Sequence, residues 1–527
     1  MSSRLARSAG LIGLATMTSR VLGVARETVV AAIFGAGTQM DAYNVAFRIP
    51  NLLRDLFAEG AMTAAFIPTF TRTMSQDGRE AAWRLGNLVI NALLLVTGAF
   101  VILAMIFAGP LTSLIAAGFK EVPGKLELTT TLTRVMLPFL STVAVAVAAM
   151  GMLNALNRFF IPSLSPAMFN VATIICAIGL VPVMPRFGLP GITALAIATL
   201  LGGAGQIAVQ WPLLRKEGFR YRPIVDFTDP GLREVLRLMV PGTLGLAAVQ
   251  INVMVNTYLA SSEPEGAVSW LTYAFRLMYL PIGLFGVSVA TAAVPEIARY
   301  SSTDDLAAIR RTISSAVRMM LMLNLPATIG LMVLAEPVVA LIFERGRFTP
   351  SDTAATAAAL MFYAPGLIGY SAVKIASPTF YSLRDSRTPV TVSVLSVAVN
   401  LALNLALVRV LGFRGLALGT AIAAMFNACT LLFLLRRRLG GLDERRIAVA
   451  FLNIAAASAA MAAAAWLTYA WLARAVPGTG EAARAVRVLS AIGVAIATLG
   501  GAARLLRIPE FDEAYNRIAR RLFPARR

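Results

Sequence analysis

Long apolar runs recur along the whole chain and are separated by short polar gaps. Fourteen of these runs reach about 20 residues or more, the length that an α-helix needs to cross about 30 Å of hydrocarbon. They lie at residues 8–34, 39–71, 84–108, 128–155, 163–184, 189–214, 231–260, 267–298, 306–335, 353–383, 388–408, 414–435, 447–473 and 486–506. Because backbone groups in lipid must be satisfied within each span, this pattern predicts an all-α polytopic membrane protein.

Two of the spans contain matching motifs. Ala-Phe-Arg at 46–48 recurs at 274–276, and Thr-Ala-Ala at 63–65 recurs at 291–293, both at an offset of 228 residues. Six spans separate the partners, an even number, so the two halves have the same orientation in the membrane. The pattern predicts two parallel six-helix lobes, as some transporters have. Chance similarity between Ala- and Leu-rich helices is the alternative explanation.

The repeat predicts four regions. These are an N-terminal lobe at 1–228, a C-terminal lobe at 229–440, two additional helices at 441–507 and a basic cytoplasmic tail at 508–527. The first span contains Arg20, Arg26 and Glu27 and has no small-residue cleavage site. It is therefore not expected to be a removable signal peptide.

The composition agrees with a membrane protein and gives it an orientation. Only 14% of residues are charged and the mean hydropathy is +0.74, whereas soluble domains average about 25% charged residues. The net charge of +20 first raises the possibility of a nucleic-acid partner. However, Lys and Arg residues gather in alternate gaps and at both ends of the chain, which predicts cytoplasmic termini and no nucleic-acid binding.

The sequence contains few of the residues that usually bind metals or cofactors. The chain has no His, and its two cysteines, Cys176 and Cys429, lie in separate apolar runs. Without His or a C-x-x-C pair, no zinc or redox site is predicted. We expect no cofactor.

Polar side chains form a continuous stripe along one helical face of span 39–71. The stripe recurs every three or four residues and contains Asp41, Asn44, Arg48, Asn51, Asp55 and Glu59, with Arg54 beside it and Pro50 in its middle. An ionised residue at mid-bilayer costs about 2.5–3.5 kcal/mol, so such residues face a partner or a wet cavity. Two explanations follow: a ladder of ion pairs (Asp41 with Arg48, Arg54 with Glu59) or the wall of a polar cavity.

Ionisable residues in other spans favour the cavity. Arg20, Arg26 and Glu27 lie in the first span, Arg276 in the eighth and Lys374 in the tenth. In a regular helix Arg20 and Arg26 point about 120° apart, and unwinding at Gly23 would bring both to one cavity. Together with the stripe, these residues place six cations against four acids. An Arg-rich cavity with a net charge of +2 suits a multivalent anion, phosphate above all.

Over nearly its whole length the chain resembles the MurJ (MviN-type) lipid II flippases of the multidrug/oligosaccharidyl-lipid/polysaccharide exporter superfamily. The motifs that carry the resemblance are Thr-Ser-Arg-Val-Leu-Gly at 18–23, Ala-Arg-Glu at 25–27, Pro-Asn-Leu-Leu-Arg at 50–54, Trp-Leu-Thr-Tyr-Ala at 270–274, and Lys374 with Phe-Tyr at 380–381. Several independent motifs occur in the family's order.

The resemblance implies a fold, a cargo and a location. It implies fourteen helices in two lobes around a central cavity, with the last two helices forming a groove for a polyprenyl tail. It implies a transporter, not an enzyme, which moves lipid II (the undecaprenyl-pyrophosphate-linked peptidoglycan precursor) from the inner to the outer leaflet of the bacterial cytoplasmic membrane by alternating access. Lipid II, the bilayer and other cell-wall synthesis proteins are the expected partners, and the chain is expected to be a monomer.

The resemblance also implies site residues. By position, Arg20, Arg26, Arg54 and Arg276 match the family's essential cavity arginines, and Asp41 matches an important carboxylate. The predicted substrate contacts are Arg20, Arg26, Arg48, Asn51, Arg54, Arg276 and Lys374, and the predicted charge partners are Glu27, Asp41, Asp55 and Glu59.

The chain departs from the family pattern in two respects. Asp55 stands where members often have a second Arg, so one substrate contact is lost or replaced by Arg48. Neutral residues stand where some members hold a cation with carboxylates; these are Asn256, Asn400, Asn404 and Thr420. Amides without a carboxylate bind sodium weakly, so they form only a weak candidate cation site.

Three other functions remain open. A flippase for another lipid-linked oligosaccharide, or a drug exporter, would keep the fold, although an Arg-rich cavity suits cationic drugs poorly. A membrane enzyme acting on polyprenyl phosphates would need a His or paired carboxylates, and the acids here are matched by arginines. A scaffold would recruit wall enzymes through the tail, but a basic amphipathic tail is expected to lie on anionic lipid.

Overall fold

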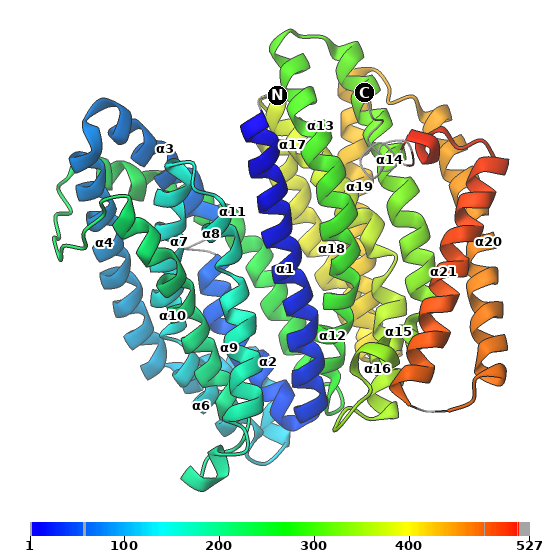
Figure 1. The fold of residues 1–527 in the computed structure, drawn as a ribbon, viewed down its shortest axis with the longest axis horizontal. Coiled ribbons are helices and arrows are strands. Elements are labelled where there is room, and N and C mark those ends of the chain that lie inside the picture. Colours follow the sequence, from blue (N-terminus) through cyan, green and yellow to red (C-terminus); the bar gives the residue numbers. More distant parts are fainter. Residues whose placement is uncertain (1–2, 56–59, 479, 514, 516–527) are drawn as a thin grey trace. The chain divides into compact units, whose positions relative to one another are not determined.

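The computed structural model describes residues 3–55, 60–478, 480–513 and 515. Every regular element in these ranges is a helix (Figure 1). Contacts between helices divide the chain into two compact units. The first comprises residues 1–269 with 345–348, and the second comprises residues 270–344 with 349–527.

The first unit is built around α7, which packs against α4 on one side and α10 on the other. In the same unit α1 packs on α9, α2 on α6 and α11 on α3. The compact unit thus includes α11, which lies beyond the predicted lobe boundary at residue 228. Its helices are α1 (Ser3–Phe34), α2 (Thr38–Arg54), α3 (Gly60–Gln76), α4 (Gly78–Ile106), α5 (Ala108–Ile115), η2 (Ala117–Glu121), α6 (Lys125–Met136), α7 (Phe139–Ala155), α8 (Phe160–Leu164), α9 (Ala167–Gly179), η3 (Met184–Phe187), α10 (Thr193–Lys216) and α11 (Pro230–Ser261).

Small residues and aromatic rings give this unit its core. A Cβ atom on Gly203 of α10 would lie 2.2 Å from Thr142 Oγ1 of α7, so only glycine permits the two helices to approach this closely. The buried rings of Phe66, Phe70 and Phe139 fill the space around them. Close packing of small residues replaces the hydrophobic drive that lipid does not supply.

Two helices of the second unit begin with a side-chain cap. The side chain of Asp305 caps α14 by accepting the Ala308 N–H at 2.9 Å, and Thr349 with Asp352 forms a capping box at α16. Its helices are α12 (Ala267–Pro281), η4 (Ile282–Gly286), α13 (Val287–Ser302), α14 (Leu306–Val333), α15 (Ala335–Phe343), α16 (Pro350–Tyr363), α17 (Gly366–Ser382), α18 (Arg387–Leu411), α19 (Phe413–Leu439), α20 (Glu444–Ala475) and α21 (Glu481–Leu505).

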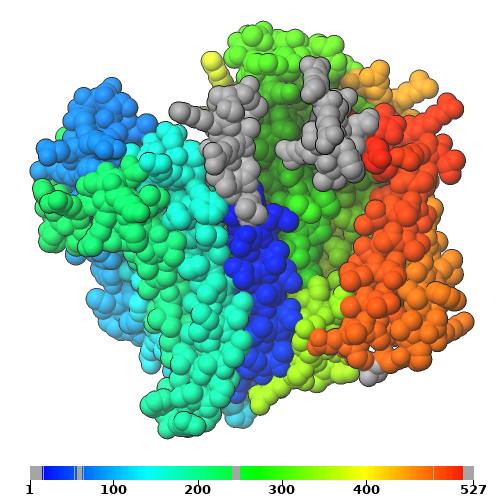
Figure 2. Space-filling model, in the orientation of Figure 1, coloured from blue at the N-terminus to red at the C-terminus, as the bar shows by residue number. Residues whose placement is uncertain are grey.

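The last two helices form a hairpin that leaves large apolar side chains exposed. Trp466 and Trp471 of α20 and Leu489 and Ile496 of α21 are each more than half exposed. Figure 2 shows α21 (red-orange) on the drawn surface of this unit. Exposed apolar side chains on a helix of membrane-spanning length are those that face lipid.

Ten helices or helix combinations in the described ranges are long and apolar enough to cross a membrane, and an eleventh results if the bent pair α16–α17 is one span. The three remaining predicted spans coincide with α1, α2–α3 and α11, and the first two carry most of the predicted intramembrane charges. The all-α polytopic architecture is therefore confirmed.

The eighth predicted span contains a break in its helix. The π-helical turn η4 at 282–286 separates α12 from α13. Gly283 and Gly286 lie in this turn, and π-helical turns are frequent at functional sites.

Candidate functional site

The carboxylate of Asp41, near the start of α2, is the most completely satisfied charge in the first unit. It is 1% exposed and lies 2.8 Å from Lys125 Nζ at the start of α6, which is 3% exposed. It also accepts hydrogen bonds from the Gly266 N–H at 2.8 Å, the Ser269 N–H at 3.0 Å and Ser269 Oγ at 2.7 Å. Four donors on one buried carboxylate hold three segments of the chain together.

This arrangement corrects the predicted ion-pair ladder. The pairing of Asp41 with Arg48 is wrong, because α6 packs on α2 and brings Lys125 to the carboxylate instead. Seven residues along a helix amount to about 10.5 Å, so Arg48 lies well away from Asp41 along α2. Asn44, one turn after Asp41, donates to Ser269 Oγ at 3.2 Å and belongs to the same network.

The charged residues of α1 lie on an unbroken helix. The predicted unwinding at Gly23 is wrong, since α1 is helical through this position, and a Cβ atom added there would lie 3.8 Å from Asn170 Nδ2 of α9. Arg26 forms an ion pair with its neighbour Glu27, and its guanidinium stacks 5.1 Å from the centre of the Phe169 ring. Arg20 is half-buried on the same helix.

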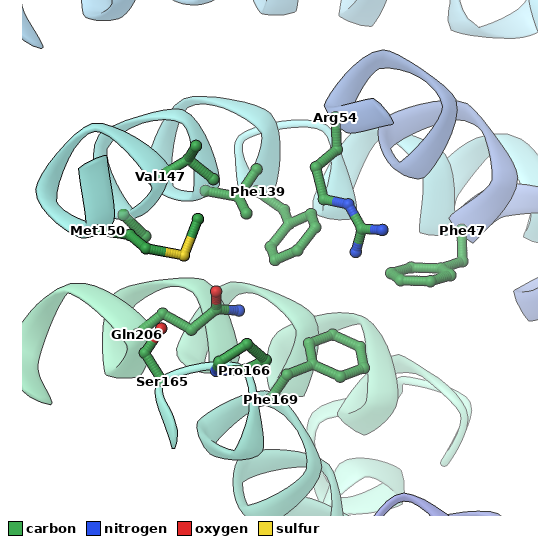
Figure 3. A pocket seen from close by; sticks show the side chains of 11 residues that line it. Phe47, Arg54, Phe139, Val147, Met150, Ser165, Pro166, Phe169 and Gln206 are labelled. Atoms are coloured by element: carbon green, nitrogen blue, oxygen red, sulfur yellow. The ribbon is translucent and has the colours of Figure 1, made fainter. Parts of the chain in front are cut away.

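A cavity of about 330 Å³ in the first unit is lined in part by Phe169, the ring on which Arg26 stacks. Figure 3 shows the Arg54 side chain extending between the rings of Phe47 and Phe139 toward Gln206 and Phe169 on the opposite wall. Phe169 thus lines the cavity with one face available to Arg26. Rings around a guanidinium exclude water and raise the strength of any charge-assisted hydrogen bond that it makes.

Asp55 holds the Arg54 guanidinium at the edge of this cavity. Arg54 donates to Asp55 Oδ1 from Nη2 at 2.9 Å and from Nε at 3.2 Å, and Gln250 of α11 donates to Oδ2 at 3.2 Å. The predicted partner of Arg54, Glu59, lies outside the described residues. Arg48 and Asn51 are half-buried on α2.

The second unit carries the remaining predicted contacts. Arg276 is half-buried on α12, and Lys374 is exposed on α17. Among the weak cation-site candidates, Asn404 donates to Asn400 Oδ1 at 3.2 Å and Asn400 donates to Thr420 Oγ1 at 3.4 Å. Asn256 belongs to α11 of the first unit. In the described ranges no three His, Cys, Asp or Glu side chains gather as a metal site.

Sequence reasoning missed several members of the site. Lys125 lies in a polar gap between two predicted spans, where a cation is expected only to influence the orientation of the chain in the membrane. In the structure it is instead buried against Asp41. Phe169, Gln206 and Gln250 lie on α9, α10 and α11, and no local pattern connects them to α2. The one available signal was a pair of amide side chains, Gln206 and Gln210, one turn apart within an apolar run.

A family model described as "Lipid II flippase MurJ" matches residues 30–479. The chain belongs to the MurJ family of lipid II flippases. It is 34% identical to a MurJ protein of Vibrio cholerae over 440 residues, which cover 82% of this chain and 83% of that protein. It is also 34% identical to "Lipid II flippase MurJ" of Burkholderia cenocepacia over 427 residues, 80% of this chain and 82% of the relative. Family and membrane-length helices together identify a multi-pass protein of the bacterial inner membrane.

Solved structures agree with the MurJ assignment. A structure titled "Lipid II flippase MurJ, inward closed conformation" matches with a TM-score of 0.75 and 26% identity, covering 94% of this chain and 99% of that one. An inward-facing multidrug resistance MATE family transporter matches with a TM-score of 0.67 and 17% identity over 83% of this chain and 99% of its own. The second likeness extends to the fold alone.

Proposed function

We propose that this chain is a lipid II flippase, which moves the undecaprenyl-pyrophosphate-linked peptidoglycan precursor from the inner to the outer leaflet by alternating access. Membership of the MurJ family supports the cargo. The observation that carries the chemistry is a ring-lined cavity that Arg54 enters and that is also lined by Phe169, the ring on which Arg26 stacks. Both termini are proposed to be cytoplasmic, and no catalysis is proposed.

The arginines suit a pyrophosphate for a geometric reason. A guanidinium presents parallel N–H groups that bind two phosphate oxygens at once, and such charge-assisted bonds are roughly twice as strong as neutral ones. Each of Arg26 and Arg54 already has a carboxylate neighbour, Glu27 and Asp55. These acids lower the cost of holding the cations in the membrane and exchange with the phosphate oxygens when cargo binds.

The remaining contacts are proposed with the same chemistry. Arg20, Arg48 and Asn51 of the first unit, and Arg276 and Lys374 of the second, supply further donors to the head group. Asp41 supports the site indirectly, since its carboxylate is fully occupied by Lys125, Gly266 and Ser269. The amides Asn400 and Asn404 bond to each other and to Thr420, which favours a packing role over cation binding.

The test is lipid II exposure on the outer leaflet in cells that depend on this chain. Arg54→Ala and Arg276→Ala are expected to abolish growth and to leave lipid II on the cytoplasmic side, because they remove cavity cations. Arg54→Lys keeps the positive charge but loses the paired N–H donors of the guanidinium, and it is expected to be partly active. Arg436→Ala, which removes an exposed cation paired with Glu444, is the control and should behave as wild type.

Two outcomes would overturn the proposal. If Arg54→Ala and Arg276→Ala leave outward lipid II movement undiminished, the pyrophosphate contacts are wrong. If depletion of the protein causes a different lipid-linked oligosaccharide to accumulate, the fold stands and the cargo is wrong.

A further inference from the structure

The loop between α10 and α11, residues 217–229, is fastened to α4 by two buried amides. Asn87 donates to the Arg220 carbonyl at 3.0 Å and accepts the Arg222 N–H at 2.8 Å. One turn later Asn91 donates to the carbonyls of Arg222 and Ile224, both at 2.8 Å. These four hydrogen bonds hold the backbone of the loop (green beside α4 in Figure 1) against α4.

This attachment sorts the loop's side chains by direction. Phe219 is buried between Trp83 and Trp211, at 5.5 Å and 5.7 Å between ring centres. The following residues, Arg220, Tyr221 and Arg222, are exposed. Val225 and Phe227 are about half exposed as well, so aromatic, aliphatic and basic side chains share one outer surface. That combination is typical of the membrane–water interface.

An apolar groove opens directly beside this surface. It has a volume of about 670 Å³ and lies between α4, α7 and α10. Leu94, Val145 and Ile207 line its apolar length, and Trp211, Arg215 and Tyr221 line its end at the loop. The groove is thus amphipathic along its axis, with hydrocarbon surface at one end and a cation at the other.

The cations at this end outnumber the acids that face them. Glu217 is engaged by Arg158 at 2.8 Å and by Arg79 at 3.6 Å, and Asp226 by Arg84 at 3.5 Å. In contrast, the described part of the chain provides no acidic partner for the exposed side chains of Arg215, Lys216, Arg220 and Arg222. Four adjacent cations without counter-charge attract an anion at the membrane surface.

We propose that this groove binds an anionic phospholipid of the bilayer. Its acyl chain lies along Leu94, Val145 and Ile207, and its phosphodiester is bound by Arg215 with Arg220 and Arg222. Trp211 and Tyr221 sit at the glycerol level, where amphipathic rings are most stable. The site is separate from the Arg54 cavity and does not depend on what the protein transports.

The headgroup contact is tested by native mass spectrometry of the purified protein with phosphatidylglycerol or phosphatidylcholine. Wild type is expected to retain phosphatidylglycerol preferentially. Arg215→Gln is expected to weaken that binding about fivefold, the equivalent of about 1 kcal/mol per surface cation. The matched control Arg186→Gln removes an exposed cation in η3 of the same unit and should change nothing.

The groove itself is tested by filling it. Ala208 is exposed on the groove wall, so Ala208→Trp occupies acyl-chain space without disturbing the core. This variant is expected to lose phosphatidylglycerol while its melting temperature stays at the wild-type value. Equal retention of both lipids by wild type, or unchanged phosphatidylglycerol binding in Arg215→Gln or Ala208→Trp, overturns the proposal. Neither readout involves lipid II, so this failure is distinguishable from failure of the flippase assignment.

Discussion

The ion pair between Asp41 and Lys125 allows a quantitative test of what holds the first unit together. Both side chains are almost fully buried, at 1% and 3% exposure, and their charged atoms are 2.8 Å apart. Asp41→Asn keeps the size of the side chain but leaves the ammonium of Lys125 buried without a counter-charge. Breaking a buried pair in this way costs about 3–5 kcal/mol.

A double-mutant cycle separates the pair from its surroundings. Lys125→Met leaves the carboxylate with three remaining donors, from Gly266 and Ser269, and is expected to cost less than Asp41→Asn. The combination of Asp41→Asn with Lys125→Met removes both charges and should recover much of the loss. The measurement is chemical denaturation of the purified variants in detergent micelles, followed by circular dichroism.

The control is a surface pair of the same charge type. Glu444→Gln removes the acid that faces Arg436, where both side chains are about half exposed, and is expected to be much less destabilising than Asp41→Asn, because solvent screens an exposed pair. If Asp41→Asn is no more destabilising than this control, or if the two single losses simply add in the double variant, the buried pair does not stabilise the unit as argued.

Three further predictions concern packing, acid response and the loop. Gly203→Ala is expected to cost about 1–3 kcal/mol, because the new Cβ would lie 2.2 Å from Thr142 Oγ1. Hydrogen bonds from Thr38 hold the pKa of Glu265 below its ordinary value of 4.5. The contribution of this carboxylate to stability is therefore present above pH 4.5 and is lost as the pH falls through the lowered pKa. Glu265→Gln should remove the corresponding drop from a plot of melting temperature against pH. Asn91→Ala removes two hydrogen bonds to loop carbonyls and should make residues 217–229 sensitive to limited proteolysis.

Each of these has a direct check. Gly98→Ala, at a helical position with nothing within 4 Å, should be neutral or stabilising, and an equal loss at Gly98 and Gly203 would refute the packing argument. An unchanged acid profile for Glu265→Gln would show that this carboxylate is not the group that titrates. A loop in Asn91→Ala that resists protease as in wild type would show that Asn87 alone suffices.

The polar stripe of α2 shows how far the sequence reaches into the site. The spacing of Asp41, Asn44 and Arg48 follows the helix period and predicts that they share one helical face, and they do lie on α2. Their partners were not predictable, since Lys125 is 84 residues from Asp41 and its position in a polar gap gave no sign of burial. Similarly, a glycine at position 23 permits unwinding, but neighbouring α9 packs against an intact α1.

The sequence by itself determined the class of the protein, the course of its membrane helices and the presence of intramembrane charges. These follow from transfer free energies and helix periodicity, which act over one turn to one span of contiguous chain. Only the tertiary structure decided that Lys125 satisfies Asp41, that Arg54 enters a cavity walled by α7, α9 and α10, and that Asn87 and Asn91 fasten a basic loop beside an apolar groove. The reason is that the rotation and spacing of packed helices select each side chain's neighbours, and those depend on residues far apart in the chain.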